Sequence, residues 1–163
     1  MSPSDETLIR AAGPADAEAL FGLICELAEY EKLTEQVRGD AETLRRSLFD
    51  ERAGEALIVE AGGEAVGYAI FFTTFSTFEC RPGIWLEDLY VRPEHRRGGV
   101  GRRLMERLAA LAVEREYVRL EWCALDWNEL ALGFYDGLGA RRLEGWTTLR
   151  LEGQRLRELA SGG

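Results

Sequence analysis

Apolar residues recur along the chain with two different periods, and the change from one period to the other predicts where helices and strands lie. After Pro14 the apolar positions fall at three- and four-residue spacing down to Tyr30, which is typical of a helix with one buried face. A similar stripe begins at Val100, and weaker helical patterns cover 41–49 and 128–138. The apolar runs that predict strands cover 7–10, 55–60, 64–72, 84–91, 118–125 and 143–151.

The connections between these runs predict the fold class. Ala61-Gly62-Gly63 separates two strand runs and predicts a β-hairpin, whereas a loop is expected around Pro82-Gly83 and one or two closing strands around Gly145. Hairpins among strand–helix units favour an α/β protein with a mixed, mostly antiparallel sheet of about six or seven strands and helices on both faces. We expect a single domain over residues 1–163, with a core at about 7–152 and polar termini, because no repeat or linker is visible.

Composition narrows the classes of partner. The 20 basic and 29 acidic side chains give a net charge of −9, which argues against nucleic acid because phosphate backbones require dense lysine and arginine. A chain of 163 residues buries roughly 70% of its unfolded surface and needs no disulfide or metal for stability. The three widely spaced cysteines form no zinc or disulfide pattern, so we expect no metal. They are Cys25, Cys80 and Cys123.

The same composition bears on location. The longest uncharged run, 65–78, is too short to span a bilayer, and the first twenty residues carry acidic side chains and no basic signal-peptide start. We therefore expect a cytoplasmic protein that does not enter a membrane, with its thiols reduced.

The stretch from Val91 to Gly101 carries the clearest chemistry. A predicted strand leads into a turn with three glycines in four positions, and a helix opens directly behind it. Converging backbone N–H groups and the positive end of a helix form a cradle for a diphosphate. Arginines around the turn would add positive potential, although a glycine-rich turn with solvated arginines is the simpler alternative. These arginines are Arg96, Arg97, Arg102 and Arg103.

This stretch also carries a family resemblance. Arg96-x-x-Gly99-x-Gly101 resembles the acyl-CoA signature of the GCN5-related N-acetyltransferases. Further segments, in the same order over nearly the whole chain, resemble the diamine (spermidine/spermine) and thialysine acetyltransferase subfamily. They are Tyr30-Glu31-Lys32-Leu33, Leu86-Glu87-Asp88-Leu89-Tyr90-Val91, Asp126-Trp127-Asn128, Phe134-Tyr135, Leu138-Gly139-Ala140 and Glu144-Gly145-Trp146. The resemblance implies acetyl-CoA as donor, a small primary amine as acceptor and a homodimer.

The resemblance assigns the cofactor contacts residue by residue. Main-chain groups of the strand end and of the glycine turn are expected to hold pantetheine and diphosphate, together with Asn128 and the residues that follow it. The family often has Glu-Pro-Ser after this asparagine, and Glu129-Leu130-Ala131 stands here instead, so backbone contacts rather than side-chain contacts are expected at 130 and 131. The expected cofactor-binding residues are Leu89, Tyr90, Val91, Arg96, Arg97, Gly98, Gly99, Val100, Gly101, Arg102, Asn128, Glu129, Ala131 and Tyr135.

Two adjacent carboxylates within an apolar strand indicate an amine site. Strict alternation over 84–91 would place Asp88 and Tyr90 on one face and Glu87 and Leu89 on the other. Removing a proton from an alkylammonium of pKa about 10.4 at pH 7 costs about 4.6 kcal/mol, so a base is needed. By the resemblance Glu87 is the base or amine ligand and Asp88 a second electrostatic contact. The alternative is one solvated carboxylate and one paired with an arginine.

A tyrosine and an asparagine on the predicted 128–138 helix each have a functional and a structural interpretation. The resemblance makes Tyr135 the general acid beside the CoA sulfur, whereas sequence alone favours a ring packed in the core. A phenol is a weaker acid than a thiol by about 1.5 pKa units, so stabilising the thiolate by a hydrogen bond is its expected role. Asn128 is expected to cap the helix as well as hold the cofactor.

The remaining acceptor residues come from the first helix end and a neighbouring strand. Tyr30 and Glu31 are expected to bind a second ammonium, and the strand side chains Glu121, Trp122 and Cys123 to shape the pocket. The alternatives are an exposed helix end and ordinary sheet packing. The predicted reaction is direct attack of the amine on the thioester. A protein lysine acceptor and a non-catalytic acetyl-CoA sensor are the competing hypotheses.

Overall fold

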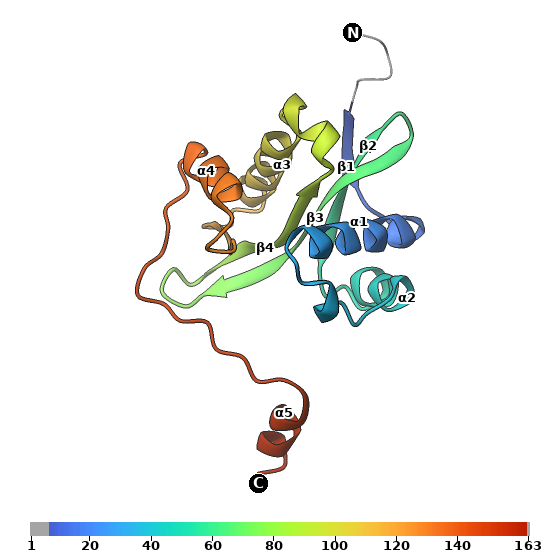
Figure 1. The fold of residues 1–163 in the computed structure, drawn as a ribbon. Coiled ribbons are helices and arrows are strands. Elements are labelled where there is room, and N and C mark those ends of the chain that lie inside the picture. Colours follow the sequence, from blue (N-terminus) through green and yellow to red (C-terminus); the bar gives the residue numbers. More distant parts are fainter. Residues whose placement is uncertain (1–6, 163) are drawn as a thin grey trace. The chain divides into compact units, whose positions relative to one another are not determined.

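The computed structural model describes residues 7–162 and contains one five-stranded sheet (Figure 1). The strands lie in chain order and all neighbours are antiparallel except the last pair, β4 and β5, which are parallel. The strands are β1 (Thr7–Ala11), β2 (Glu55–Ala61), β3 (Glu64–Ser76), β4 (Arg81–Val91) and β5 (Leu120–Trp122). This confirms a mixed, mostly antiparallel sheet, with fewer strands than the sequence predicted.

Four of the five α-helices in the described residues begin close to the predicted positions, whereas the helix at Gly153–Ala160 was not predicted. The α-helices are α1 (Ala17–Tyr30), α2 (Ala41–Arg45), α3 (Val100–Glu114), α4 (Glu129–Gly137) and α5 (Gly153–Ala160). Short 3-10 turns cover Pro14–Asp16, Thr34–Gln36 and Pro93–Gly98, and a π-helical turn, Arg46–Asp50, follows α2. No helix within residues 7–162 is both long and apolar enough to cross a bilayer.

The chain divides into two compact units, one ending at Cys123 and the other beginning at Ala124. The first unit contains the whole sheet with α1, α2 and α3, and the second contains α4 and α5. A single domain over the whole chain stays a prediction, and the polar ends at 1–6 and 163 lie outside the described residues.

Apolar side chains of the sheet and helices pair up on the two faces of the sheet. Leu20 and Leu23 of α1 pack with Ile58, Tyr68 and Tyr90 on one face. Burying one such leucine contributes about 1.5–3 kcal/mol to stability. On the other face α3 packs against β4 and β5 and buries a stripe at three- and four-residue spacing, which explains why it forms there (Figure 1). That stripe consists of Val100, Leu104, Met105, Leu108 and Ala112.

A β-bulge breaks the predicted alternation of β4. Ile70 of β3 pairs with Asp88, whereas the next residue, Phe71, pairs with Leu86, so Glu87 is an extra residue without a partner of its own. The two-residue period is interrupted at this point, and Leu86 lies on the face opposite to Asp88. The expectation that alternation runs unbroken from 84 to 91, with Glu87 and Asp88 on opposite faces, was therefore wrong.

Two further strand predictions were wrong. Pro82-Gly83 lies inside β4 rather than in a loop, because the Pro82 carbonyl accepts a hydrogen bond from Val118 N–H at 3.0 Å and proline is tolerated near a strand start. Glycine suits position 83, since a Cβ there would lie 3.0 Å from the Arg119 carbonyl oxygen.

The predicted strand at 143–151 does not form. Within the described residues this stretch pairs with no other strand, and α5 follows it in the chain. An alternating sequence pattern predicts a strand, but a strand forms only where a second strand lies beside it to accept and donate its hydrogen bonds.

An ion-pair network ties α1 to the end of β4. Arg92, directly after β4, donates from Nη2 to Glu26 Oε1 at 2.8 Å and from Nε to both Glu26 oxygens. Tyr90 Oη donates to Glu26 Oε2 at 3.2 Å, and Arg92 also pairs with Glu64 at the start of β3. The Arg92 guanidinium holds the pKa of Glu26 below its ordinary value. The network fixes the end of β4, where several of the predicted site residues lie.

We predict that Glu26→Gln lowers the free energy of unfolding by about 1–2 kcal/mol at pH 7, because it removes charge-assisted hydrogen bonds. The lowered pKa means that the wild-type advantage is complete above the unfolded carboxyl's value and is lost as pH falls through the folded one. Urea unfolding at neutral pH and at about pH 3.5 measures both. Glu42→Gln, in the more exposed pair with Arg45, is the control and should cost less. An equal loss at both pH values would contradict the assignment.

Candidate active site

A cavity of about 550 Å³ lies between α1, the segment that follows it, α2 and the bulge of β4. Its apolar lining comes mainly from α1 and the segment that follows it, and its charged lining includes both bulge carboxylates. The charged residues are Glu31, Arg38, Asp40, Glu87 and Asp88, and apolar residues among the rest are Phe21, Ile24, Leu27, Leu33, Val37 and Leu44. The bulge explains how two consecutive residues reach one cavity, since strict alternation would separate them.

Asp88 is the more buried member of the carboxylate pair. Burial and the neighbouring charge of Glu87 raise the pKa of Asp88, while a hydrogen bond from Tyr68 Oη at 3.2 Å works in the opposite direction. Tyr68 is fully buried, and burial together with Asp88 raises the pKa of its phenol, so it stays a donor. Glu87 is exposed and accepts a hydrogen bond from Trp85 Nε1 at 3.0 Å. A carboxylate with a raised pKa is a stronger proton acceptor.

Glu31 brings a third carboxylate to the cavity from the end of α1. Burial, and to a smaller degree the charge of Asp88, raise the pKa of Glu31. In a partly apolar cavity the negative charges of neighbouring acids repel one another, and a bound cation would reduce that repulsion. The sequence prediction grouped Glu31 with Glu87 and Asp88, and the structure brings these three residues together.

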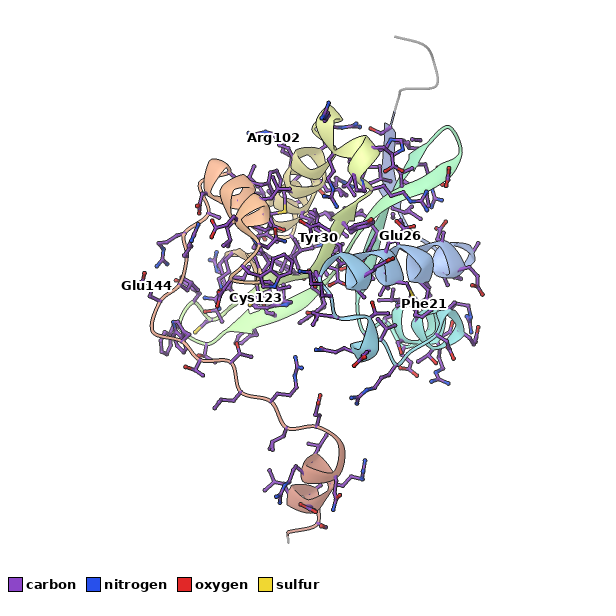
Figure 2. All side chains as sticks on the ribbon, in the orientation of Figure 1. Phe21, Glu26, Tyr30, Arg102, Cys123 and Glu144 are labelled. Carbon is purple, nitrogen blue, oxygen red and sulfur yellow. The ribbon has the colours of Figure 1, made fainter. Side chains whose placement is uncertain are left out.

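Tyr30, the neighbour of Glu31, faces a different group. The Arg96 guanidinium lies 5.0 Å from the centre of the Tyr30 ring and 5.7 Å from that of Tyr90. Arg96 Nε also donates to the Val91 carbonyl at 2.7 Å. Figure 2 shows Tyr30 at the C-terminal end of α1. Arg96 therefore connects the end of α1 to the end of β4, and its side chain is engaged within the protein.

The main chain of Leu89 and Val91 points away from β3. Arg92 N–H donates to the Val66 carbonyl at 2.9 Å, which makes that pair a hydrogen-bonded one. Because hydrogen-bonded and non-hydrogen-bonded pairs alternate along an antiparallel ladder, Leu89 and Val91 present their N–H and C=O groups on the other side. Strand β5 pairs with β4 only at 84–86. These groups can therefore receive an extended ligand as an added strand.

The glycine turn opens directly onto α3. Gly99 caps the helix with φ of 70°, a conformation that favours glycine, and no side chain caps the helix N-terminus. A Cβ at Gly99 would meet nothing within 4 Å, so the turn is open on that side. The cluster of positive charge is smaller than predicted, because Arg102 pairs with Glu106 at 3.0 Å and Arg103 hydrogen-bonds to Thr7. Arg97 and Gly98 are exposed in the 3-10 turn, and Val100 and Gly101 form the first turn of α3.

The predicted acceptor residues of β5 do not line the cavity. Glu121 pairs with Arg119 at 2.9 Å and lies beside Trp85 of β4, and Trp122 lies beside Leu86. Cys123 is exposed at the end of β5 (Figure 2). Their part in acceptor binding stays a prediction.

The other predicted site residues lie in the second unit. Asn128 is buried and accepts a hydrogen bond from Ala131 N–H at 3.2 Å on Oδ1, which confirms it as the N-cap of α4. The Ala131 N–H is thus already engaged in the cap. Glu129 is exposed in the first turn. Tyr135 is half-buried, with its ring centre 5.2 Å from that of Phe134.

Sequence analysis missed three residues of this region. The sequence predicted Tyr68 only as part of a strand. In the structure β3 pairs with β4 so that the Tyr68 hydroxyl donates a hydrogen bond to Asp88. Arg38 and Asp40 lie in a short polar segment between helices, without periodicity that would assign them to a site. Pairing the 64–72 and 84–91 runs in antiparallel register would have found Tyr68.

Comparison with known proteins agrees with these observations. The profile of the acetyltransferase (GNAT) family matches residues 23–140. A Bos taurus thialysine N-epsilon-acetyltransferase is 40% identical over 165 residues, covering 94% of this chain and 96% of its own. A Caenorhabditis elegans protein of the same name is 39% identical over 150 residues, covering 90% and 92%. Among solved structures, an integron cassette protein from the mobile metagenome of V. cholerae matches with a TM-score of 0.80 at 25% identity, covering 94% and 97%. The chain belongs to the acetyltransferase (GNAT) family and is an N-acetyltransferase.

Proposed function

We propose that this protein transfers the acetyl group of acetyl-CoA to a primary amine of a small cationic acceptor, either a polyamine or diamine or a lysine-like amino acid such as thialysine. The observation that carries the proposal is the cavity in which Glu31, Glu87 and Asp88 meet. Burial, and to a smaller degree the charge of a neighbouring acid, raise the pKa of Glu31 and of Asp88, and a bound ammonium group would favour their ionised forms. The relatives named thialysine N-epsilon-acetyltransferase support the acceptor class.

The geometry of the β4 strand edge and of the glycine turn supports acetyl-CoA as the donor. Leu89 and Val91 present outward main-chain groups for the pantetheine amides, and the open turn at Gly98 and Gly99 with the uncapped start of α3 suits a diphosphate. Acetyl-CoA supplies an activated acetyl thioester, which the neutral amine attacks directly, without a covalent intermediate on Cys123. Arg96 contributes by holding the strand end through Val91 rather than by offering a free charge.

Proton removal from the bound ammonium falls to the bulge carboxylates. Glu87 is the proposed base or amine ligand, directly or through an ordered water, and its hydrogen bond from Trp85 orients it. Asp88 is the second contact, and its raised pKa makes it a competitor for the role of base. Because the tyrosine Tyr68 donates to Asp88, the carboxylate is held in place in either role.

Tyr135 of α4 is the proposed proton donor to the leaving thiolate. Forming the new N–C bond breaks the C–S bond, and the electron pair left on sulfur is stabilised by a phenol hydrogen bond or takes its proton. Asn128 supports this role because it fixes the first turn of the helix that carries Tyr135.

An amine panel tests the function. Purified protein with acetyl-CoA should release free thiol when given thialysine, lysine, spermidine or cadaverine, and thiol release is read with a thiol reagent. Glu87→Gln and Asp88→Asn should each lower kcat/KM by at least about tenfold, corresponding to about 1.4 kcal/mol. The acidic limb of the pH profile should disappear in whichever variant removes the base, since activity requires the ionised carboxylate.

The panel also separates the competing functions. Binding of acetyl-CoA without thiol release for any amine would favour the sensor, and release only with a lysine-containing peptide would favour a protein acceptor. Glu94→Gln, at an exposed position in the 3-10 turn outside the cavity, is the matched control and should behave as wild type.

We predict that Tyr135→Phe lowers kcat by about tenfold or more while acetyl-CoA binding changes little, because only the hydroxyl is lost. Single-turnover kinetics and calorimetric binding of CoA measure the two effects separately. Phe134→Leu, which alters the neighbouring ring contact but no hydroxyl, is the control. Unchanged turnover in Tyr135→Phe would remove Tyr135 from the mechanism.

We propose that the protein is a homodimer and that the second unit contributes to the subunit contact. Trp146 is 83% exposed and Leu149 is 88% exposed, in the stretch that carries a strand pattern without a partner strand. Exposed apolar side chains that cluster along one segment favour burial against a partner. Other exposed apolar residues of this unit are Leu143, Leu151, Leu156 and Leu159.

We predict that Trp146→Ser weakens dimerisation by at least about tenfold, because it removes a large aromatic side chain from the proposed subunit contact. Sedimentation velocity over a range of micromolar concentrations measures this effect. Phe78→Ser, at a 97% exposed position of the first unit, is the control and should leave the dimer intact. A wild-type protein that sediments as a monomer throughout would contradict the proposal.

A further inference from the structure

The charged lining of the acceptor cavity contains one cation. Four carboxylates, from Glu31, Asp40, Glu87 and Asp88, share the cavity with the guanidinium of Arg38. Arg38 and Asp40 lie two residues apart in the segment between the 3-10 turn at 34–36 and α2. This end of the cavity therefore carries both a positive and a negative group, whereas the bulge end carries carboxylates only.

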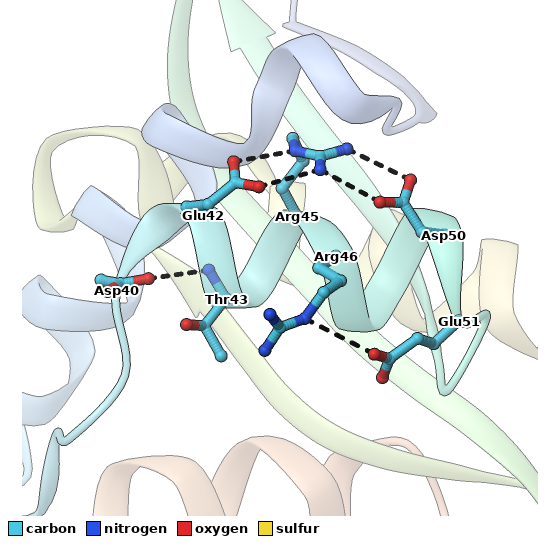
Figure 3. Close-up of polar contacts among 7 residues, drawn as sticks. All are labelled: Asp40, Glu42, Thr43, Arg45, Arg46, Asp50 and Glu51. Carbon is cyan, nitrogen blue, oxygen red and sulfur yellow. Dashed lines mark hydrogen bonds and ion pairs between the residues drawn. The ribbon is translucent and has the colours of Figure 1, made fainter.

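The Arg38 guanidinium has no polar partner within the described part of the chain. Within residues 7–162 it makes no ion pair and no side-chain hydrogen bond, although four carboxylates line the same cavity. The arginines of the adjoining helix behave differently, as Figure 3 shows: Arg45 pairs with Glu42 and Asp50, and Arg46 with Glu51. The Arg38 guanidinium is free to pair with an anionic group of a ligand, and its planar fork matches a carboxylate.

Asp40 is held in a fixed orientation beside it. Its Oδ1 accepts a hydrogen bond from Thr43 N–H at 2.7 Å as the N-cap of α2 (Figure 3). This bond lowers the pKa of Asp40, which therefore stays ionised at neutral pH. The carboxylate is exposed, so an ammonium group can approach it although the Thr43 side chain and the Glu42 main chain also hydrogen-bond to it. Arg38 and Asp40 thus match the carboxylate and ammonium of an α-amino acid.

The exposure of these groups orders them by depth. Asp88 is half-buried at the sheet, whereas Arg38 and Asp40 are exposed. An acceptor with its reacting amine at Asp88 and an amino-acid head at the rim would pair Asp88, Asp40 and Arg38 each with a group of opposite charge. A diamine of the same length offers the same second ammonium to Asp40 but leaves Arg38 without an anionic partner, so the two acceptors differ at Arg38 alone.

Building on the proposed function, we propose that Arg38 is a specificity-determining residue that binds the α-carboxylate of the acceptor, so that the cavity selects a lysine-like amino acid over the matching diamine. Asp40 binds the α-ammonium of the same acceptor. The amine that reacts lies at the bulge carboxylates and is the same in both acceptor classes.

Matched acceptors test this assignment. Thialysine is compared with bis(2-aminoethyl) sulfide, and lysine with cadaverine, because each pair differs only by the carboxylate. Arg38→Gln should lower kcat/KM for the amino acids by about tenfold, mainly through KM, and leave the diamines unchanged or improved. Arg38→Lys should retain part of the preference. Arg81→Gln, an exposed arginine outside the cavity, is the control.

The outcomes are separable from the test of the function itself. An equal loss on both members of a pair, or no change on either, overturns the role of Arg38 while leaving the acetyltransferase intact. If wild type acetylates neither class, calorimetric binding of the same four amines in the presence of CoA still tests the assignment. A wild-type preference for the amino acids that Arg38→Gln abolishes supports it, and equal binding of both members of a pair overturns it.

Discussion

The one-residue bulge at Glu87 is the constraint on which the proposed acceptor site depends. In an unbroken strand, consecutive carboxylates point to opposite faces, and one of them would lie under α3 in the apolar core. The extra residue lets both Glu87 and Asp88 line the cavity beside α1. Tyr68 then fixes Asp88 from the neighbouring strand. Two acids that would be costly in a regular strand line one cavity because the strand is irregular there.

Arg96 joins the acceptor region to the region of the glycine turn. Its guanidinium stacks on Tyr30, next to Glu31, and its Nε holds the carbonyl of Val91 at the strand edge. The signature arginine is therefore a structural link whose position depends on both the helix end and the strand end. If Arg96 supplied only positive charge, these contacts would be unnecessary, because the solvated neighbour Arg97 supplies a similar electrostatic field.

Sequence reasoning located most elements because their patterns are local. The stripe of α1, the hairpin glycines and the Asn128 cap each depend on residues within a few positions of one another. It failed where the deciding partner is distant in the chain. The bulge is set by register with β3, the bond to Asp88 comes from Tyr68 twenty residues away, and Arg38 joins the site only through the cavity. The strand pattern at 143–151 failed for the same reason, because a ladder needs a second strand.

In the proposed function, the raised pKa values of Glu31 and Asp88 would link acceptor binding to proton release. In the free cavity, burial and mutual repulsion favour the protonated carboxyls, whereas a bound ammonium favours the ionised ones. The same binding event thus increases the ionised fraction of the carboxylates at the moment when an amine proton must be accepted. Once an amine has lost its proton to one of them, the positive charge that held the other is gone. The carboxyl that has taken the proton is then neutral, and the hydrogen bond from Tyr68 Oη to Asp88 stabilises a negative charge that remains on Asp88.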